Sequence, residues 1–281
     1  MLLIASRKSL QSKRRKNVEK LKKYWGTLYE LRFFIWHMVK IDLKNKFRRS
    51  KLGILWTFVS PLCLSAIMGT VFAVAFHYEI LDYMPYVLSG ILFWDLVMSS
   101  FSAGGYSIIS HDSYIRQCSH PITMYTLKNS LVYIITFLIA CLSLVLWVIL
   151  RHPVNVLIWL LAMPGTLIIY FLLAWGGTTI AGYTCVQYRD YPMMAPLILQ
   201  VVWYLSPIFF QKSLFETNEL LYAWFKINPV THMLELLRSP LLEGRMPSLS
   251  NYLVSFAFAL VIDLLAVRIN RKKERNVIFY L

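Results

Sequence analysis

The chain has 281 residues, of which 58% are hydrophobic and only 15% are charged, and its mean hydropathy is +0.55. Soluble domains draw about a quarter of their residues from Asp, Glu, Lys and Arg, so this composition excludes an ordinary soluble fold. The formal net charge of +15 does not indicate a nucleic-acid partner, because it accompanies long apolar segments and no folded nucleic-acid-binding motif.

The N-terminal region is strongly basic. The first 51 positions hold 16 of the 29 Lys and Arg residues. Lys and Arg next to apolar spans mark the cytoplasmic side of a membrane. We therefore expect residues 1–23 to form a basic cytoplasmic tail that contacts the anionic headgroups of membrane lipids. The apolar start of this tail is too short for a cleavable signal peptide.

Residues 24–51 are predicted to form an interfacial helix and a connector. Within residues 24–39, four apolar side chains recur at helical spacing, which favours an amphipathic helix lying along the inner membrane interface. Three aromatic residues widen its apolar side, so a helix packed partly beneath the membrane bundle is equally compatible. The four are Leu28, Leu31, Ile35 and Met38, and the three are Phe33, Phe34 and Trp36.

Six nearly uncharged runs follow. A helix needs about 20 residues to cross a hydrocarbon core of ~30 Å. The sequence therefore predicts an all-α integral membrane protein with six transmembrane helices in a domain of residues 52–270. The fourth run is too long for one perpendicular crossing, and we interpret it as one helix that tilts, extends beyond the lipid or bends near Pro164. The runs are 52–76, 85–109, 131–150, 154–186, 193–210 and 252–267.

Charge orients these spans. Five further Lys and Arg residues follow Val267. Both termini, including the tail 271–281, are therefore expected in the cytoplasm. With six crossings, the loop 111–120 is also cytoplasmic. The stretch 211–250 is external, and its segments 220–227 and 231–242 are amphipathic but too short to span.

Cofactor and catalytic chemistry have little support in the sequence. The four cysteines and six histidines show no metal-ligand spacing. Asp95, in the outer third of its span, and Asp263, close enough to Arg268 to be solvated, have no obvious acidic partner. This argues against a proton relay and against a paired-carboxylate enzyme. No nucleotide-binding P-loop occurs, so we expect no catalytic residue, no metal and no cofactor bound by this chain.

A series of short motifs carries a family resemblance. A basic stretch runs into Leu-Gly-x-Leu-Trp, a proline follows inside the first span, and further motifs recur in the second half of the chain. Their order over about residues 25–281 resembles the membrane subunits of ABC-2 type exporters, above all those for O-antigen, capsular polysaccharide or teichoic acid. The motif residues are Leu52, Gly53, Trp56, Pro61, Arg189, Asp190, Pro207, Asn228, Pro229 and Arg238.

The resemblance implies a permease rather than an enzyme, in the bacterial cytoplasmic (inner) membrane. It implies a homodimer with two copies of a separate ATPase subunit, which binds ATP and Mg, and a polyprenyl-linked polysaccharide as cargo. In the family, the segment between the last two spans forms short re-entrant helices. For this chain, an ordinary extracellular hairpin is the alternative. The first and fifth spans line the conduit, which makes Trp56, Phe58, Trp203, Tyr204, Phe209 and Phe210 channel candidates.

The ATPase must dock on a cytoplasmic element, and the loop 111–120 is the largest cytoplasmic loop between spans. We expect its residues Tyr114, Ile115, Arg116 and Gln117 to couple ATPase movement to the spans, although many relatives carry Phe-Pro-Arg here. Two alternatives remain: an ABC-2 exporter of a small drug or lipid, and a membrane-embedded transferase for lipid-linked sugars. The transferase is less favoured, because the cytoplasmic loops offer only Asp112 and Asp190 as acids.

Overall fold

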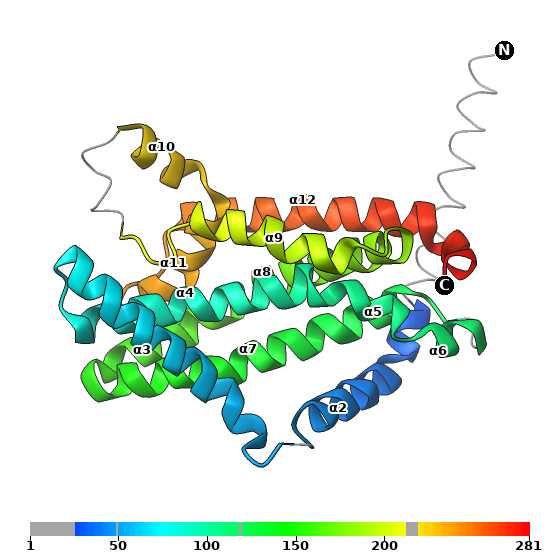
Figure 1. The fold of residues 1–281 in the computed structure, drawn as a ribbon, viewed down its shortest axis with the longest axis horizontal. Helices are drawn as coiled ribbons and strands as arrows, with labels where there is room; N and C mark the ends of the chain where they lie inside the picture. Colours follow the sequence, from blue (N-terminus) through cyan, green and yellow to red (C-terminus); the bar gives the residue numbers. More distant parts are fainter. Residues whose placement is uncertain (1–25, 49, 118–119, 212–218) are drawn as a thin grey trace.

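The computed structural model describes residues 26–281 except 49, 118–119 and 212–218. The predicted tail 1–23 and the start of the 24–51 segment lie outside this range. Within it, every regular element is a helix, and the long helices run side by side along one axis (Figure 1). The all-α prediction is confirmed.

Five helical stretches in the described part are long and apolar enough to cross a membrane. These five candidate spans correspond to the predicted first, second, third, fourth and sixth runs. The helices are α3 (Trp56–Phe76) with the short η1 (Gly53–Leu55), α4 (Ile80–Phe101) continuing through η2 (Ala103–Gly105) into α5 (Tyr106–Ile109), α7 (Thr123–Arg151), α8 (Pro153–Gln187) and α12 (Leu249–Lys273).

The fourth span is a single helix, as predicted. It has 35 residues with Pro164 inside it. At 1.5 Å per residue it is about 52 Å long, well above a hydrocarbon core of ~30 Å. Therefore α8 must tilt or extend beyond the lipid.

The predicted fifth span differs. Its helix, α9 (Tyr191–Tyr204), has 14 residues, which is about 21 Å. Residues 205–211 leave the helix, because Pro207 has no N–H to continue the ladder and the carbonyls that follow accept bonds from other helices. The predicted apolar run extends to Phe210, beyond the end of the helix, because hydropathy depends on side chains and not on backbone hydrogen bonds.

Two short helices follow, α10 (Glu219–Ile227) and α11 (Pro229–Leu241). The Asn228 side chain accepts a hydrogen bond from the Val230 N–H at 2.9 Å, and Pro229 occupies the first turn. Both are favoured helix-start residues. The predicted break between two short helices is thus confirmed. Eleven of the 13 residues of α11 are buried, and α11 packs against α12, α8 and α4, so it is part of the bundle core.

The opposite end of the bundle carries α2 (Arg32–Arg48), α6 (Asp112–Gln117) and η4 (Glu274–Phe279) (Figure 1). Leu28 and Ile35 are buried in a second hydrophobic cluster, and Leu31 and Met38 pack against it. The other side of this segment exposes Phe33 and Trp36. The predicted apolar face therefore packs onto the bundle, while the aromatic side is free to meet lipid.

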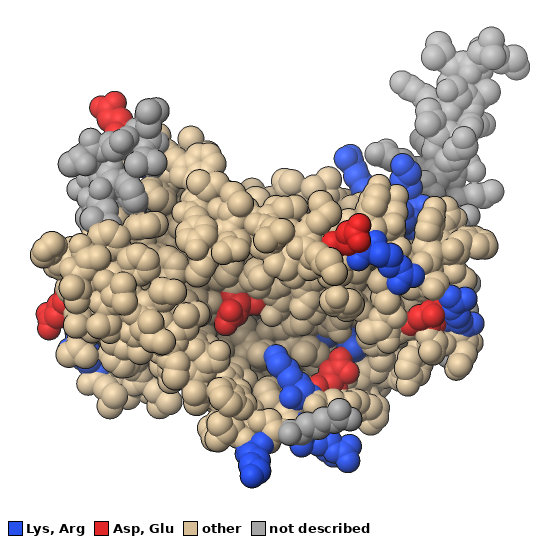
Figure 2. Space-filling view, in the orientation of Figure 1, with Lys and Arg blue, Asp and Glu red and all other residues tan. Residues whose placement is uncertain are grey.

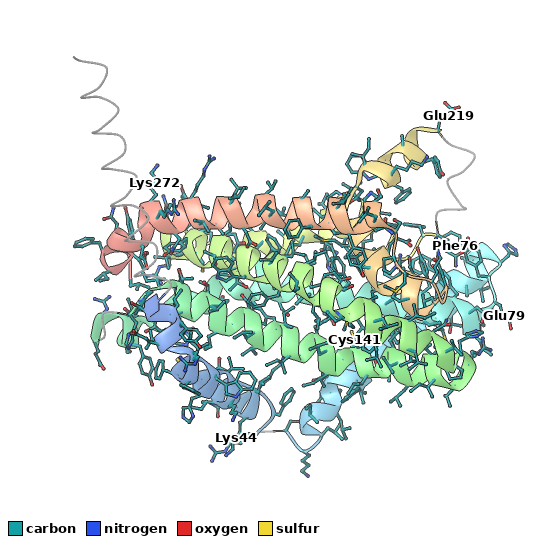
Figure 3. The ribbon with its side chains drawn as sticks, turned by 180° about the vertical axis from the view of Figure 1, so that it is seen from behind. Lys44, Phe76, Glu79, Cys141, Glu219 and Lys272 are labelled. Atoms are coloured by element: carbon teal, nitrogen blue, oxygen red, sulfur yellow. The ribbon has the colours of Figure 1, made fainter. Side chains whose placement is uncertain are left out.

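Charge separates the two ends. Most Lys and Arg residues in view lie toward the end that holds α6 and the C-terminus (Figure 2). From behind, Lys272 marks that end, whereas Phe76, Glu79 and Glu219 mark the other (Figure 3). We call these the α6 end and the α11 end.

Candidate translocation pathway and coupling surface

The segment 205–210 at the α11 end is held by buried side chains of other helices. Arg238, only 3% exposed, donates to the Pro207 and Ile208 carbonyls at 2.8 and 2.9 Å and to the Ser89 hydroxyl at 3.0 Å. Because guanidinium is a rigid fork of donors, one side chain joins α11 to α4 and to this turn. Three predicted motif positions, Pro207, Asn228 and Arg238, therefore meet here, since the Asn228 amide also donates to the Leu205 carbonyl at 3.2 Å.

Two tyrosines of α4 complete the hydrogen bonding of this turn. The Tyr86 hydroxyl donates to the Phe210 carbonyl at 2.8 Å, and the Tyr83 hydroxyl donates to the Phe209 carbonyl. The turn runs so close to α4 that a Cβ on Gly90 would lie 2.8 Å from Ile208 Cγ2. Such contacts are too short, so the close approach requires glycine. Sequence reasoning missed Tyr83, Tyr86 and Gly90, because only the fold brings α4 beside the turn.

Aromatic rings surround this turn and form what we call the aromatic cluster. Stacked and edge contacts join them, with Trp203 and Phe209 at 5.1 Å, Phe72 and Phe209 at 5.1 Å, and Phe76 and Phe210 at 5.7 Å between ring centres. Of the predicted channel candidates, Phe209 is buried, Trp203 and Phe210 are half-buried, and Tyr204 is 61% exposed. Tyr204 and the exposed parts of Trp203 and Phe210 are thus the ring surface that this cluster leaves uncovered.

The other two channel candidates, Trp56 and Phe58, lie on α3, away from the aromatic cluster. Trp56 is exposed and lines a cavity together with Gly53 and Pro61. Phe58 is half-buried, and Leu52 is exposed at the preceding turn. Gly53 has a φ of +50°, a left-handed conformation that favours glycine, which explains the Leu-Gly pair where α2 turns into α3. Within one chain, Trp56 and Trp203 therefore belong to two separate sites.

The Arg189–Asp190 motif occupies a third place, the turn between α8 and α9 at the α6 end. Both side chains are exposed. Arg189 donates to the Tyr280 carbonyl at 3.3 Å. This contact joins the turn to the C-terminal segment, whose Val277 is buried in the second hydrophobic cluster.

The predicted coupling residues form the short helix α6. Ile115 is buried in the second hydrophobic cluster, whereas Tyr114, Arg116 and Gln117 are exposed. Arg116 pairs with Asp112 one turn earlier at 2.6 Å. One apolar side chain thus anchors α6 to the bundle, and the other three form a small exposed surface at this end.

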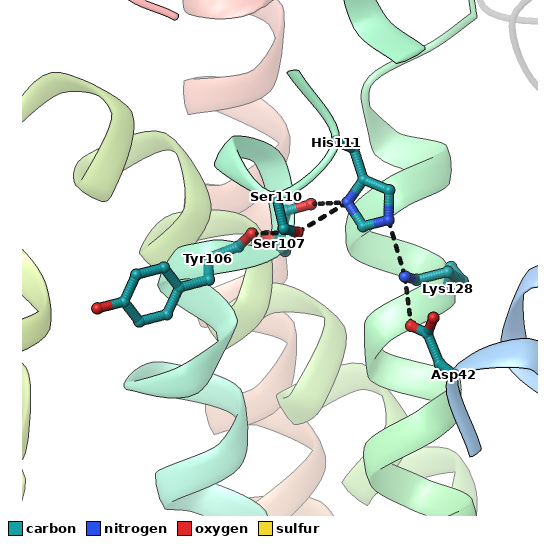
Figure 4. A network of polar contacts seen from close by, with 6 residues as sticks. All are labelled: Asp42, Tyr106, Ser107, Ser110, His111 and Lys128. Atoms are coloured by element: carbon teal, nitrogen blue, oxygen red, sulfur yellow. Dashed lines mark hydrogen bonds and ion pairs between the residues drawn. The ribbon is translucent and has the colours of Figure 1, made fainter. Parts of the chain in front are cut away.

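A buried ionic network fixes the base of this surface (Figure 4). The Lys128 ammonium of α7 is 1% exposed and lies 2.5 Å from an Asp42 carboxylate oxygen of α2 and 3.0 Å from His111 Nε2. Because an ammonium only donates, His111 accepts at Nε2 and donates from Nδ1 to the Ser107 carbonyl at 2.9 Å. Sequence reasoning missed this network, although a lysine just before an apolar run was a usable signal.

The two acids within spans differ from expectation. Asp263 is 5% exposed beside Gly176, and neither of its carboxyl oxygens has a hydrogen-bond partner, so it is not solvated near Arg268. Asp95 lies in the last third of α4, because that helix begins at Ile80, and it lines the Trp56 cavity. Among the described residues, no group of His, Cys, Asp or Glu is placed to hold a metal ion.

These features define a multi-pass helical membrane protein whose polar groups stabilise its two ends. Residues 34–242 match the family described as ABC-2 type transporter, and the chain belongs to this family. It is 22% identical over 226 residues to the O-antigen export system permease protein RfbA of Klebsiella pneumoniae, which covers 80% of this chain and 85% of that protein. It is also 22% identical over 245 residues to a protein of the same name from Myxococcus xanthus, covering 84% and 90%.

Family and relatives establish the chain as the membrane subunit of an ABC exporter. The predicted resemblance is confirmed. Membership also implies an ABC ATPase partner for this permease.

Proposed function

We propose that this permease exports a polyprenyl-linked, O-antigen-like polysaccharide across the bacterial inner membrane. The main support for this cargo is the aromatic cluster at the α11 end, where Trp203, Tyr204 and Phe210 present ring surface beside a turn held by Arg238. Flat apolar rings suit pyranose faces, and they let a hydroxyl-rich polymer slide because each contact is weak. The names of the two similar permeases support the same cargo.

The distribution of charge supports one orientation in the membrane. The α6 end carries most of the basic side chains in view, so we place it and both termini in the cytoplasm (Figure 2). The α11 end then faces outward. In this placement, α9 and the turn 205–211 together form the fifth of six crossings, α12 is the sixth, and α10 with α11 is the re-entrant segment between them. The burial of α11 in the bundle supports this arrangement.

A second copy of the chain completes the passage. Apolar side chains on α3 and α9 are exposed in the single chain, which favours a partner copy or lipid against them. We propose a homodimer in which these two helices line the conduit, with two ATPase subunits that bind ATP and Mg²⁺. The exposed residues include Ile67, Val71, Val74, Met193, Leu197 and Val201.

The test is deletion of the gene for this chain, followed by complementation. We expect polymer to accumulate in the cytoplasm and surface polysaccharide to disappear, and wild type to restore both. Tyr204→Ala should restore export poorly, whereas Phe256→Ala, an exposed residue on α12, is the matched control. Normal surface polysaccharide in the deletion strain would reject this cargo and leave a small drug or a lipid as the exported molecule.

A further inference from the structure

A cavity of about 370 Å³ lies between α2, α3, α4 and α7. The face drawn in Figure 2 is hollowed near its centre, with acidic and basic side chains beside the hollow. Its size lies within the range of small-molecule sites, about 300–1,000 Å³. The residues that line it include Lys46 of α2, Trp56 of α3 and Asp95 of α4.

Asp95 is the unusual member of this lining. It belongs to a membrane-spanning helix, yet its side chain is exposed and makes no ion pair or hydrogen bond with the described residues. A charged group within a membrane is costly unless it is paired or meets water or a ligand, and such residues mark functional sites. The packing of the bundle does not use this carboxylate, so its role lies in the cavity.

Lys46 places an opposite charge on another wall of the cavity. It forms no ion pair with Asp95, yet the two groups interact electrostatically. Desolvation lowers the pKa of Lys46 from its ordinary value, and the Asp95 carboxylate opposes this shift. Two separated opposite charges suit a ligand that offers hydrogen-bond donors to the one and an anion to the other.

The rest of the lining is hydroxyl-rich and aromatic. Trp56 has half of its surface exposed, and it provides an indole. Hydroxyls come from α3, α4 and α7, namely Thr57, Ser60, Ser99, Tyr133 and Thr136. An apolar lipid tail has no use for these groups, and one carboxylate is too few to hold a metal ion. A sugar meets all of them, through its hydroxyls and its ring face.

We propose that this cavity binds the sugar-phosphate headgroup of a lipid, with the phosphate at Lys46 and the first sugar between Trp56 and Asp95. This inference rests on the proposed function, because it makes the cavity the place where cargo enters the permease. Its position beside α2 fits that role, since the exposed aromatic side of α2 is suited to the lipid interface where such headgroups lie.

The test uses the full chain with its ATPase partner in nanodiscs and three photoreactive probes. They are a polyprenyl diphosphate that carries N-acetylglucosamine, the same lipid without sugar, and phosphatidylethanolamine. We expect the sugar-bearing probe to crosslink to peptides of α3 and α4 around Trp56 and Asp95. We also expect it to bind at least tenfold more tightly than the other two.

Two variants assign the groups. Asp95→Asn should weaken the sugar-bearing probe about tenfold and leave the sugar-free lipid unchanged, whereas Lys46→Gln should weaken both. Lys44→Gln on the same helix and Asp82→Asn at the far end of α4 are matched controls that should change neither. Thermal unfolding and gel filtration verify that each variant folds. Crosslinking of the wild-type protein locates the binding site without any substitution.

Equal binding of all three probes, or crosslinks confined to other helices, would overturn the proposal. Tighter binding of phosphatidylethanolamine would also overturn it and would make the cavity a phospholipid site. These results differ from failure of the proposed function, which appears as normal surface polysaccharide in the deletion strain whatever the cavity binds.

Discussion

The guanidinium of Arg238 lies over the ring of Tyr86, 3.6 Å from its centre. The same guanidinium donates to the carbonyls of Pro207 and Ile208. Arg238 thus joins α11, α4 and the turn after α9, and this junction positions the aromatic cluster. A cation over a ring face is most stabilising where water is excluded, as at this buried residue.

Gly90→Ala tests this junction without removing any of its polar groups. The new Cβ would lie 2.9 Å from the Ile208 carbonyl and 3.0 Å from an Arg238 nitrogen. Overpacking of this kind costs about 1–3 kcal/mol, so we expect lower thermal stability in detergent and weaker export. Gly26→Ala, where a Cβ meets nothing within 4 Å, is the control. A Gly90→Ala protein with wild-type stability would contradict the requirement for glycine at this close approach.

The Asp42–Lys128 pair predicts an asymmetry between two substitutions. Asp42→Asn leaves a buried ammonium without its counter-charge and should lower the free energy of unfolding by about 1–3 kcal/mol. Lys128→Met should cost less, within about 1 kcal/mol, because the Asp42 side chain is 39% exposed and can be hydrated. Chemical unfolding in detergent measures both. Equal losses in the two variants would contradict the structural picture.

His111 predicts a pH dependence of stability. Burial and the Lys128 ammonium lower its pKa below the ordinary value of 6.5, against the opposing effects of the Ser107 carbonyl and the Asp42 carboxylate. The unfolded chain therefore takes up this proton at a higher pH than the folded protein does. The contribution of His111 is fully present above about pH 6.5 and declines as the pH falls below it.

The expected result is a melting temperature that falls more steeply below about pH 6.5 in wild type than in His111→Gln. His152→Gln, an exposed histidine at the α11 end, should keep the wild-type profile. Differential scanning fluorimetry at a series of pH values measures this. Parallel pH profiles for wild type and His111→Gln would show that His111 does not cause the pH dependence and would contradict a neutral His111 in the folded protein.

Arg116→Glu tests the coupling surface of α6. The Arg116–Asp112 pair is exposed, and such pairs contribute about 0.2–1 kcal/mol, so the fold should hardly change. We expect ATP hydrolysis to continue while export falls, because the altered surface no longer docks the ATPase. Arg245→Glu, which disrupts an exposed pair with Glu243 at the other end, is the control. Unchanged export in Arg116→Glu would count against α6 as the coupling element.

Short-range features of the sequence determined much of this protein. Depletion of charge and the length of the apolar runs predicted five of the spanning helices, because a helix in lipid must satisfy its own backbone. Asn228 and Pro229 predicted the start of α11, because N-cap chemistry is local. The order of the short motifs indicated the family before the comparison confirmed it.

Only the tertiary structure decided how distant groups meet. It ended α9 at Tyr204, because carbonyls beyond it bond to Arg238 and Tyr86 rather than to their own helix. It also paired Lys128 with Asp42, which lie 86 positions apart, and brought Lys46 and Asp95 to one cavity. Hydropathy reports the preference of each residue for lipid or water, whereas these contacts depend on which helices pack together, and that is a property of the whole bundle.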